Sequence, residues 1–278
     1  MKSNIEEVVN SWQENGSIPI DLRGVTLGGA LAVLYEAYSW AKAQSIPLVE
    51  VRFGDKYAWL KSRLNSTFIE TGRDSPLVYP SVIESFSRFA AHSTLRYLSQ
   101  RGEYLSNLST DIWDVFTVEN VDKFLSANLS KSTILLSFRF QQKTPSLGDF
   151  DSMLWRPIID RLANSHKLLV LGTEIPRGEF TGETISFAED SLDLAQQIEL
   201  ISRDIFPLIG DANGLFTARI WSEIPYLCFK NQDYDNAEML QEHDGHDRLW
   251  IGHSRQKLIR GLASTKIIEK YLQEVANE

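Results

Sequence analysis

The sequence predicts an α/β protein with two Rossmann-like domains that face a cleft. Strand-like apolar runs alternate with helical patterns along the chain, and this alternation predicts parallel, doubly wound sheets. Turns that contain glycine join several strands to the helices that follow them. The chain has 278 residues, enough for two domains of ordinary size. A short polar break at residues 128–132 separates the halves, so we expect domains over 1–130 and 131–278.

The first half opens with a βαβ pattern. We expect a strand over residues 18–22, a glycine-rich loop over 23–29, a helix over 30–44 and a strand over 47–53. Apolar residues recur in the helical segment at the spacing of one helix face. The crossover between the two strands should be right-handed. Residues 81–125 are predicted to be mainly helical and complete the first domain.

The second half continues the alternation. Its predicted strands cover residues 133–140, 167–171, 184–187, 206–209 and 226–229. Its predicted helices cover residues 151–165, 191–202, 214–221 and 264–275, and residues 255–257 are expected in the loop before the last helix. We expect Ser191 or Asp190 to cap the second of these helices, because short polar side chains are favoured at that position.

The net charge, the cysteine content and the lack of long apolar runs limit the classes of protein to which this chain can belong. The formal net charge is -9, which argues against a general nucleic-acid binder, because such proteins carry a basic face. Cys228 is the single cysteine, so no internal disulfide forms, and its apolar surroundings predict a buried strand residue in a protein of a reducing compartment. The N-terminus lacks the apolar core of a signal peptide. No apolar stretch approaches the roughly 20 residues of a transmembrane segment. These features predict a cytoplasmic protein and leave a homo-oligomer open.

The most informative segment is a Gly-Asp-Ala-Asn-Gly turn between a predicted strand and a predicted helix. Its residues Gly210, Asp211, Asn213 and Gly214 can form a nest of backbone N–H groups at a helix N-terminus, which attracts anions. Parallel sheets hold nucleotides at this edge. The charge of Asp211 would favour a ribose or sugar hydroxyl over a phosphate. The alternative is a plain βα turn in which Asn213 caps the helix.

Other polar residues follow predicted strands of the second half. Arg139 lies near the end of an apolar strand, and its planar guanidinium suits bidentate contact with phosphate oxygens. The alternative for Arg139 is an ion pair with a carboxylate at the sheet edge. Glu174 could hold the ribose hydroxyls of a nucleotide, and so could three further acidic residues. Those three are Glu183, Glu189 and Asp190. The alternative for all four is a solvated loop carboxylate.

The first loop is rich in glycine. Gly24, Gly28 and Gly29 permit close approach of the backbone to a ligand, and a tight βα turn is the alternative. Their spacing is not that of a dinucleotide-binding loop, so NAD is disfavoured and no organic cofactor is expected. The histidines of residues 243–253 lack the spacing of zinc ligands, so we expect a surface loop and no metal site.

Three segments carry a family resemblance. They are residues 22–31 with the first loop, the strand 134–139, and residues 199–229 with the Gly-Asp-Ala-Asn-Gly turn. Together they resemble the two-domain, metal-independent glycosyltransferase architecture called GT-B. The resemblance is closest to its fucosyltransferase-like and heptosyltransferase-like groups.

The resemblance also has departures. Arg139 matches the first arginine of the fucosyltransferase motif His-x-Arg-Arg, whereas Ser137 stands in place of its histidine and Phe140 in place of its second arginine. In the first loop, Gly29-Ala30 stands where the family has an asparagine or aspartate.

The resemblance implies a transfer reaction. The second domain would bind a nucleotide-diphosphate sugar, with Arg139 and the turn at 210–214 neutralising the diphosphate without a metal. The first domain would present a glycan acceptor of a bacterial surface polysaccharide. A general base would take the proton of the acceptor hydroxyl, and Asp21 and Asp55 are the candidates, with structural roles as their alternative. A non-catalytic nucleotide- or glycan-binding protein and a sugar-nucleotide epimerase are the rival functions.

Overall fold

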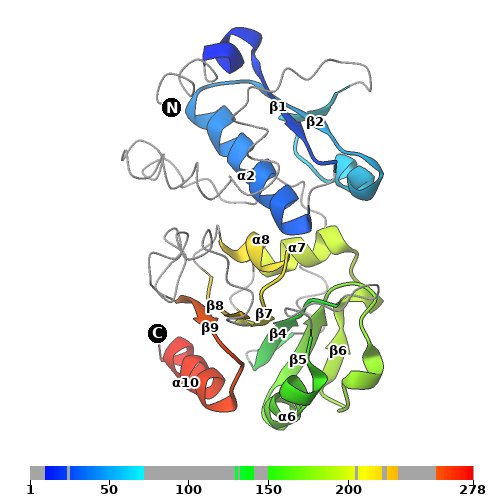
Figure 1. Cartoon of the computed structure of the whole chain (residues 1–278), viewed down its shortest axis with the longest axis vertical. Helices are drawn as coiled ribbons and strands as arrows, with labels where there is room; N and C mark the ends of the chain where they lie inside the picture. Colours follow the sequence, from blue (N-terminus) through cyan, green and yellow to red (C-terminus); the bar gives the residue numbers. More distant parts are fainter. Residues whose placement is uncertain are drawn as a thin grey trace. The chain divides into compact units, whose positions relative to one another are not determined.

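The computed structural model describes residues 10–23, 26–71, 129–130, 132–140, 150–203, 206–220, 224–230 and 255–277. The chain divides into two compact units, Met1–Val118 and Glu119–Glu278 (Figure 1). The helical segment expected over residues 81–125 lies outside the described residues. The domain boundary expected after residue 130 stays a prediction. No helix in the described ranges has both the length and the apolar character needed to cross a membrane.

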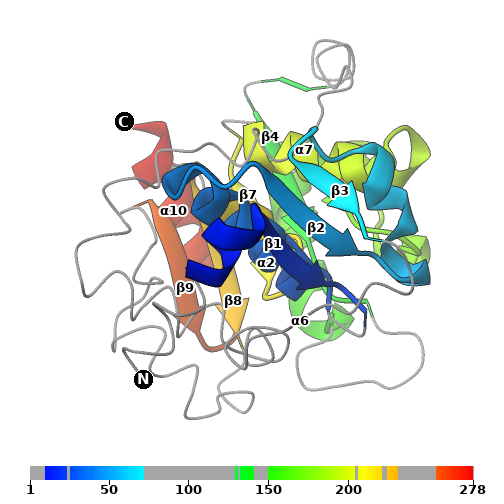
Figure 2. The ribbon, with the colours of Figure 1, turned by 90° about the horizontal axis from the view of Figure 1, so that it is seen from above.

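The first unit contains a parallel three-stranded sheet. Its elements are β1 (Ser17–Asp21), α2 (Leu27–Ala43), β2 (Leu48–Arg52), the 3-10 helix η1 (Asp55–Ser62) and β3 (Phe68–Glu70). The strand order is β1-β2-β3, and Figure 2 shows the three strands side by side. The expected βαβ unit is therefore confirmed. The elements η1 and β3 were not predicted, because β3 has only three residues and η1 mixes polar and apolar residues without a clear period.

Helix α2 begins earlier than the sequence indicated. The Thr26 hydroxyl accepts a hydrogen bond from the Gly29 N–H at 3.3 Å, and the Thr26 carbonyl accepts one from the Ala30 N–H at 2.8 Å. Thr26 thus caps a helix that starts at Leu27. Gly28 and Gly29 lie in its first turn, so the expectation that they belong to a loop was wrong. Burial of the apolar face of α2, which includes Leu31 and Leu34, together with the cap offsets the low helix propensity of two adjacent glycines.

The second unit contains a six-stranded parallel sheet. Its strands are β4 (Thr133–Ser137), β5 (Lys167–Leu171), β6 (Ile185–Phe187), β7 (Leu208–Asp211), β8 (Tyr226–Lys230) and β9 (Gln256–Arg260). Their spatial order is β6-β5-β4-β7-β8-β9. The chain therefore builds the sheet outward from β4 in one direction and then from β7 in the other. This arrangement is the strand order of the doubly wound Rossmann fold.

Helices cover both faces of this sheet. They are α6 (Ser152–Ala163), α7 (Leu194–Arg203), α8 (Phe216–Ile220) and α10 (Thr265–Ala276), with the 3-10 helices η5 (Arg177–Glu179) and η6 (Ala188–Asp190) between β5 and α7. Figure 1 shows α6 and α10 on one face of the sheet and α7 and α8 on the other. The α/β class with parallel sheets is thus confirmed.

The start of α7 differs from the prediction. The Asp193 carboxylate accepts from the Gln196 N–H at 2.9 Å, and the Gln196 side chain accepts from the Asp193 N–H at 2.9 Å. This reciprocal pair is a capping box. The expectation of Ser191 or Asp190 as the cap was wrong, because Asp190 ends η6.

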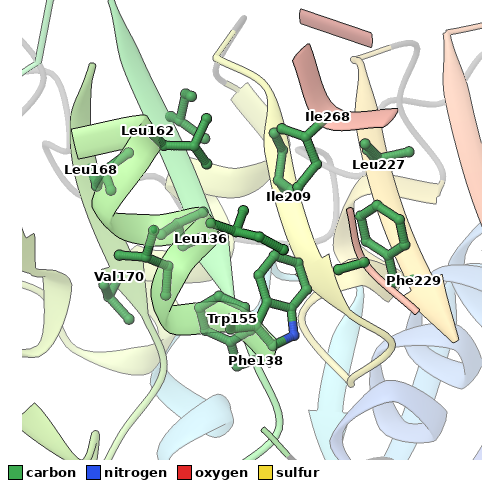
Figure 3. Packing of buried hydrophobic residues seen from close by; sticks show 14 of the residues in the cluster. Leu136, Phe138, Trp155, Leu162, Leu168, Val170, Ile209, Leu227, Phe229 and Ile268 are labelled. Atoms are coloured by element: carbon green, nitrogen blue, oxygen red, sulfur yellow. The ribbon is translucent and has the colours of Figure 1, made fainter. Parts of the chain in front are cut away.

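One apolar cluster fills the space between the sheet and the helices α6 and α10 (Figure 3). Trp155 of α6 is fully buried at its centre and packs against Phe138 and Phe229. The strands contribute every second residue to this face, as the pleat requires. Examples are Ile134 and Leu136 from β4, Leu168 and Val170 from β5, and Leu227 and Phe229 from β8. Cys228 is buried, as expected from its surroundings.

Candidate functional site

The candidate site lies where β4 and β7 run side by side. These strands are the two from which the sheet grows in opposite directions, and they pair in register with Ser137 opposite Gly210. In open parallel sheets, ligands bind outside the carboxyl ends of the strands at this topological switch point. The carboxyl ends of β4 and β7 carry Ser137, Arg139, Asp211 and Asn213. The second unit thus places most of the predicted donor-binding residues at the carboxyl ends of two adjacent strands.

Gly210 allows the two strands to approach each other. Its φ is +156°, and a Cβ atom placed on it would lie 1.8 Å from the carbonyl oxygen of Ser137. No side chain fits in that space. The glycine is therefore required for the close approach of the carboxyl ends of β4 and β7, whatever ligand binds there.

Asn213 ties the turn to both strands. The Ser137 hydroxyl donates a hydrogen bond to Asn213 Oδ1 at 3.2 Å, and the Leu215 N–H donates to the same oxygen at 2.9 Å. Asn213 Nδ2 donates to the Asp211 carbonyl at 2.8 Å. The Ala212 N–H is also used within the protein, as a donor to the Phe229 carbonyl at 2.9 Å. Asn213 thus has the capping role of the alternative interpretation, and anion binding by the turn stays a prediction.

Asp211 is a partly buried carboxyl group at the switch point. The Trp155 indole N–H donates to both of its oxygens, at 3.0 and 2.9 Å. Burial raises the pKa of Asp211 to about 7; the indole hydrogen bond opposes this rise, and the nearby charge of Asp151 adds to it. Near neutral pH the group is therefore about half protonated. A protonated carboxyl can donate a hydrogen bond to a ligand hydroxyl and does not repel phosphate.

Arg139 lies two residues beyond β4 in the connection to α6. Its backbone is fixed, because the Phe150 N–H donates to the Arg139 carbonyl at 2.9 Å. The preceding residue, Phe138, packs against Phe150 with ring centroids 4.9 Å apart. The side chain of Arg139 is half-buried. The sequence thus correctly placed Arg139 at the carboxyl edge of the sheet, one strand away from Asp211.

Glu174 lies in the connection that follows β5. It adopts φ of +58°, and its N–H donates to the Glu189 carboxylate at 2.9 Å. Arg177 pairs with Glu189 at 3.1 Å and also with Asp190. Glu189 and Asp190 therefore brace this connection. The Glu174 side chain is exposed, and its contact with a ribose stays a prediction. Glu183 is exposed just before β6.

Gln197 fixes the backbone at the carboxyl edge of the second unit's sheet, and this role was not predicted from the sequence. Its side chain is fully buried and makes two hydrogen bonds to Gly172, the residue after β5. Oε1 accepts from the Gly172 N–H at 2.8 Å, and Nε2 donates to the Gly172 carbonyl at 3.1 Å. Nε2 also donates to the Leu192 carbonyl at 3.2 Å. A glutamine within an amphipathic helix gives no sequence signal for such a role.

We expect Gln197→Met to lower the free energy of unfolding by about 2–4 kcal/mol. Methionine preserves the side-chain volume but leaves the partly buried Gly172 N–H and carbonyl without their Gln197 partner. Urea denaturation followed by circular dichroism measures the change. Gln196→Met is the matched control, since Gln196 contributes only to the cap of α7 and should cost about 1 kcal/mol. Equal losses in the two variants would contradict this role for Gln197.

The first unit places both candidate bases at one sheet edge. Asp21 ends β1, and its two carboxylate oxygens each accept from Arg23 Nε at 3.0 Å. Arg23 Nη2 completes the ion pair at 2.5 Å. Asp55 is exposed at the start of η1, just beyond the end of β2. Gly24 lies outside the described residues.

A metal centre needs several ligating side chains close together. Within the described ranges, no group of three or more His, Cys, Asp or Glu side chains is placed to hold a metal ion. The histidine-containing loop at residues 243–253 lies outside those ranges.

Comparison with known proteins defines the class of fold. Neither protein-family models nor curated protein sequences give a match. Among solved structures, the chain is similar to a glycosyl transferase family 9 protein from Veillonella parvula DSM 2008. The TM-score is 0.51 and the identity 13%, over 93% of this chain and 88% of that one.

A second similarity is to a particular enzyme, the E. coli heptosyltransferase WaaC, solved with ADP. The TM-score is 0.52 and the identity 10%, over 93% of this chain and 99% of that one. WaaC solved with ADP-2-deoxy-2-fluoro heptose gives a TM-score of 0.50 at the same identity. The chain thus shares the α/β fold of these GT-B glycosyltransferases. The predicted resemblance to the heptosyltransferase-like group is confirmed for the fold, and the fucosyltransferase-like resemblance stays a prediction.

Proposed function

We propose that this protein is a metal-independent glycosyltransferase that moves a sugar from a nucleotide-diphosphate donor to a glycan acceptor. The observation that supports it most is the position of Asp211 and Asn213 at the switch point of the second unit, with Arg139 two residues beyond the neighbouring strand β4. This sheet edge is where α/β proteins hold nucleotides. The fold shared with glycosyltransferases, one of them solved with ADP, gives the proposal its reaction class.

The donor would bind to the second unit. Arg139 would contact the diphosphate, where its guanidinium stabilises the charge that develops as the nucleotide diphosphate leaves. Asp211 would hydrogen-bond to a hydroxyl of the ribose or of the sugar. The turn from Gly210 to Gly214 would approach the diphosphate with its backbone, and Glu174 would hold the ribose.

The first unit would supply the base. An acceptor hydroxyl oxygen forms a bond to the anomeric carbon, the bond from that carbon to the diphosphate breaks, and the base takes the hydroxyl proton. Asp21 is held by Arg23 through both carboxylate oxygens, whereas Asp55 is exposed. We therefore assign the base to Asp55 and a structural role to Asp21. Gly24, Gly28 and Gly29 would bring the backbone near the acceptor.

Nucleotide binding by an arginine variant tests the proposal. We expect one of ADP, GDP, UDP and CMP to raise the melting temperature of the wild-type protein, with or without EDTA. Arg139→Ala should weaken that binding roughly 10- to 100-fold, because hydrogen bonds to charged groups contribute about 1.5–3 kcal/mol. Titration calorimetry with the selected nucleotide measures the loss.

Arg156→Ala is the matched control. Arg156 is exposed on α6, and its variant should bind the nucleotide like wild type. Absence of a response to any nucleotide, or equal binding by Arg139→Ala and wild type, would refute the donor site. Binding without turnover would favour the non-catalytic protein. Conversion of the free sugar nucleotide without acceptor would favour the epimerase.

A further inference from the structure

The first unit contains a large cavity at the carboxyl edge of its sheet. Its volume is about 750 Å³, and its described lining comes from the β1–α2 connection, the end of β2, η1 and the end of β3. Small-molecule sites typically have volumes of about 300–1,000 Å³. The cavity is therefore large enough for a ligand of one or two rings.

The charge of this cavity opposes that of the whole chain. The chain carries 28 basic and 37 acidic residues. The described cavity lining instead contains four cationic and two acidic side chains. The cationic ones are Arg23, Arg52, Lys56 and Lys61, and the acidic ones are Asp55 and Glu70. A concave surface with an excess of one sign of charge attracts ligands of the opposite sign, and its low-dielectric walls strengthen the attraction.

Ion pairs fix two of these cations of the cavity lining. Arg23 pairs with Asp21 at the end of β1, and Lys61 of η1 pairs with Glu70 at the end of β3. The pair Lys61–Glu70 joins two segments of the lining, whereas Arg23 is held by a residue of its own segment.

Gly54 is part of this construction. It adopts φ of +63°, and a Cβ atom placed there would lie 2.7 Å from Arg23 Cγ. The absence of a side chain at residue 54 lets Arg23 lie across the end of β2. Gly54 therefore leaves room for the Arg23 side chain, in addition to allowing the turn.

We propose that this cavity binds a phosphorylated small molecule. Its phosphate would contact the guanidinium and ammonium groups, since guanidinium forms bidentate contacts with phosphate and ammonium contributes a point charge. The rest of the molecule would lie against Phe53 and Ala58, which also line the cavity. Asp55, the proposed base, also lines the cavity, so the inference rests in part on the proposed function and names a phosphorylated acceptor; the binding itself can be measured whether or not the chain transfers a sugar.

Titration calorimetry of the full chain tests the proposal with three probes: glucose 6-phosphate, inorganic phosphate and glucose. We expect binding of glucose 6-phosphate, weaker or equal binding of phosphate, and none of glucose. Lys56→Gln should weaken phosphate-dependent binding about tenfold, as expected for one charge-assisted contact. Adding Lys61→Gln should weaken it further. Both lysines are exposed, so the variants should fold.

Lys266→Gln, at an exposed residue of the second unit, is the matched control and should bind like wild type. Gly54→Ala should also weaken binding by displacing Arg23. The affinity for glucose 6-phosphate relative to that for inorganic phosphate shows whether the cavity binds the phosphate ester or free phosphate. Equal binding of glucose and its phosphate, or wild-type binding by the double lysine variant, would overturn the proposal. Loss in Arg139→Ala alone would place the phosphate at the donor site and overturn it too.

Discussion

Gly210→Ala is expected to destabilise the second unit by about 4 kcal/mol or more. The new methyl group would lie 1.8 Å from the Ser137 carbonyl oxygen, so β4 and β7 must separate at the centre of the sheet. Overpacking costs about 1–3 kcal/mol or more, and the positive φ adds about 1–3 kcal/mol for a residue with a side chain. Urea denaturation followed by circular dichroism measures the loss, and a cooperative transition absent at 25 °C would be its extreme form.

Substitutions at two further glycines separate steric overlap from backbone strain in this loss of stability. Gly261 has φ of +144°, but a Cβ atom placed on it would meet no other atom within 4 Å, so Gly261→Ala reports the backbone strain alone. Gly178 has open space around it and no positive φ, so Gly178→Ala should change stability little. The expected order of destabilisation is Gly210, Gly261, Gly178. A Gly210→Ala variant no less stable than Gly261→Ala would show that the strands tolerate a wider separation.

The apolar strands of the second unit could be predicted because short, almost purely apolar runs are typical of buried strands. Strands buried on both faces appear as continuous apolar runs, and β5 was predicted with its observed bounds. The edge strand β9 could not be recognised, since only Leu258 and Ile259 of its five residues QKLIR are apolar and they show no alternation. The expectation that Gln256 and Lys257 lie in a loop was wrong, because both pair with β8.

The candidate site was predictable only in part. Arg139, Asp211 and Asn213 follow apolar runs, and in a parallel sheet such residues meet at one edge. The contacts that give them their properties were not predictable. Trp155 and Asp211 are 56 residues apart in the chain, and their hydrogen bond depends on how α6 packs against the sheet. The same holds for Gln197 and Gly172, which are 25 residues apart.

Asp211→Asn is expected to remove a pH dependence of stability. The pKa of Asp211 is about 7 in the folded protein and 3.8 in its ordinary state, so between these values the folded state binds the proton more tightly. Wild-type stability therefore falls as the pH rises through this window and levels off above about pH 7. The amide of the variant still accepts from Trp155 but does not titrate. Relative to wild type, the variant should gain about 3 kcal/mol between pH 4.5 and pH 8, at about 1.4 kcal/mol per pH unit.

Urea denaturation of both proteins at pH 4.5, 6 and 8 measures this gain. The difference between variant and wild type cancels the other titrating groups, and any constant packing cost of the amide cancels when the pH values are compared. Asp160→Asn, at an exposed residue of α6, is the control and should run parallel to wild type. A pH-independent difference for Asp211→Asn would show that the carboxyl is ionised throughout. In that case Asp211 could not donate a hydrogen bond to a donor hydroxyl, and it would act in the site only as an acceptor.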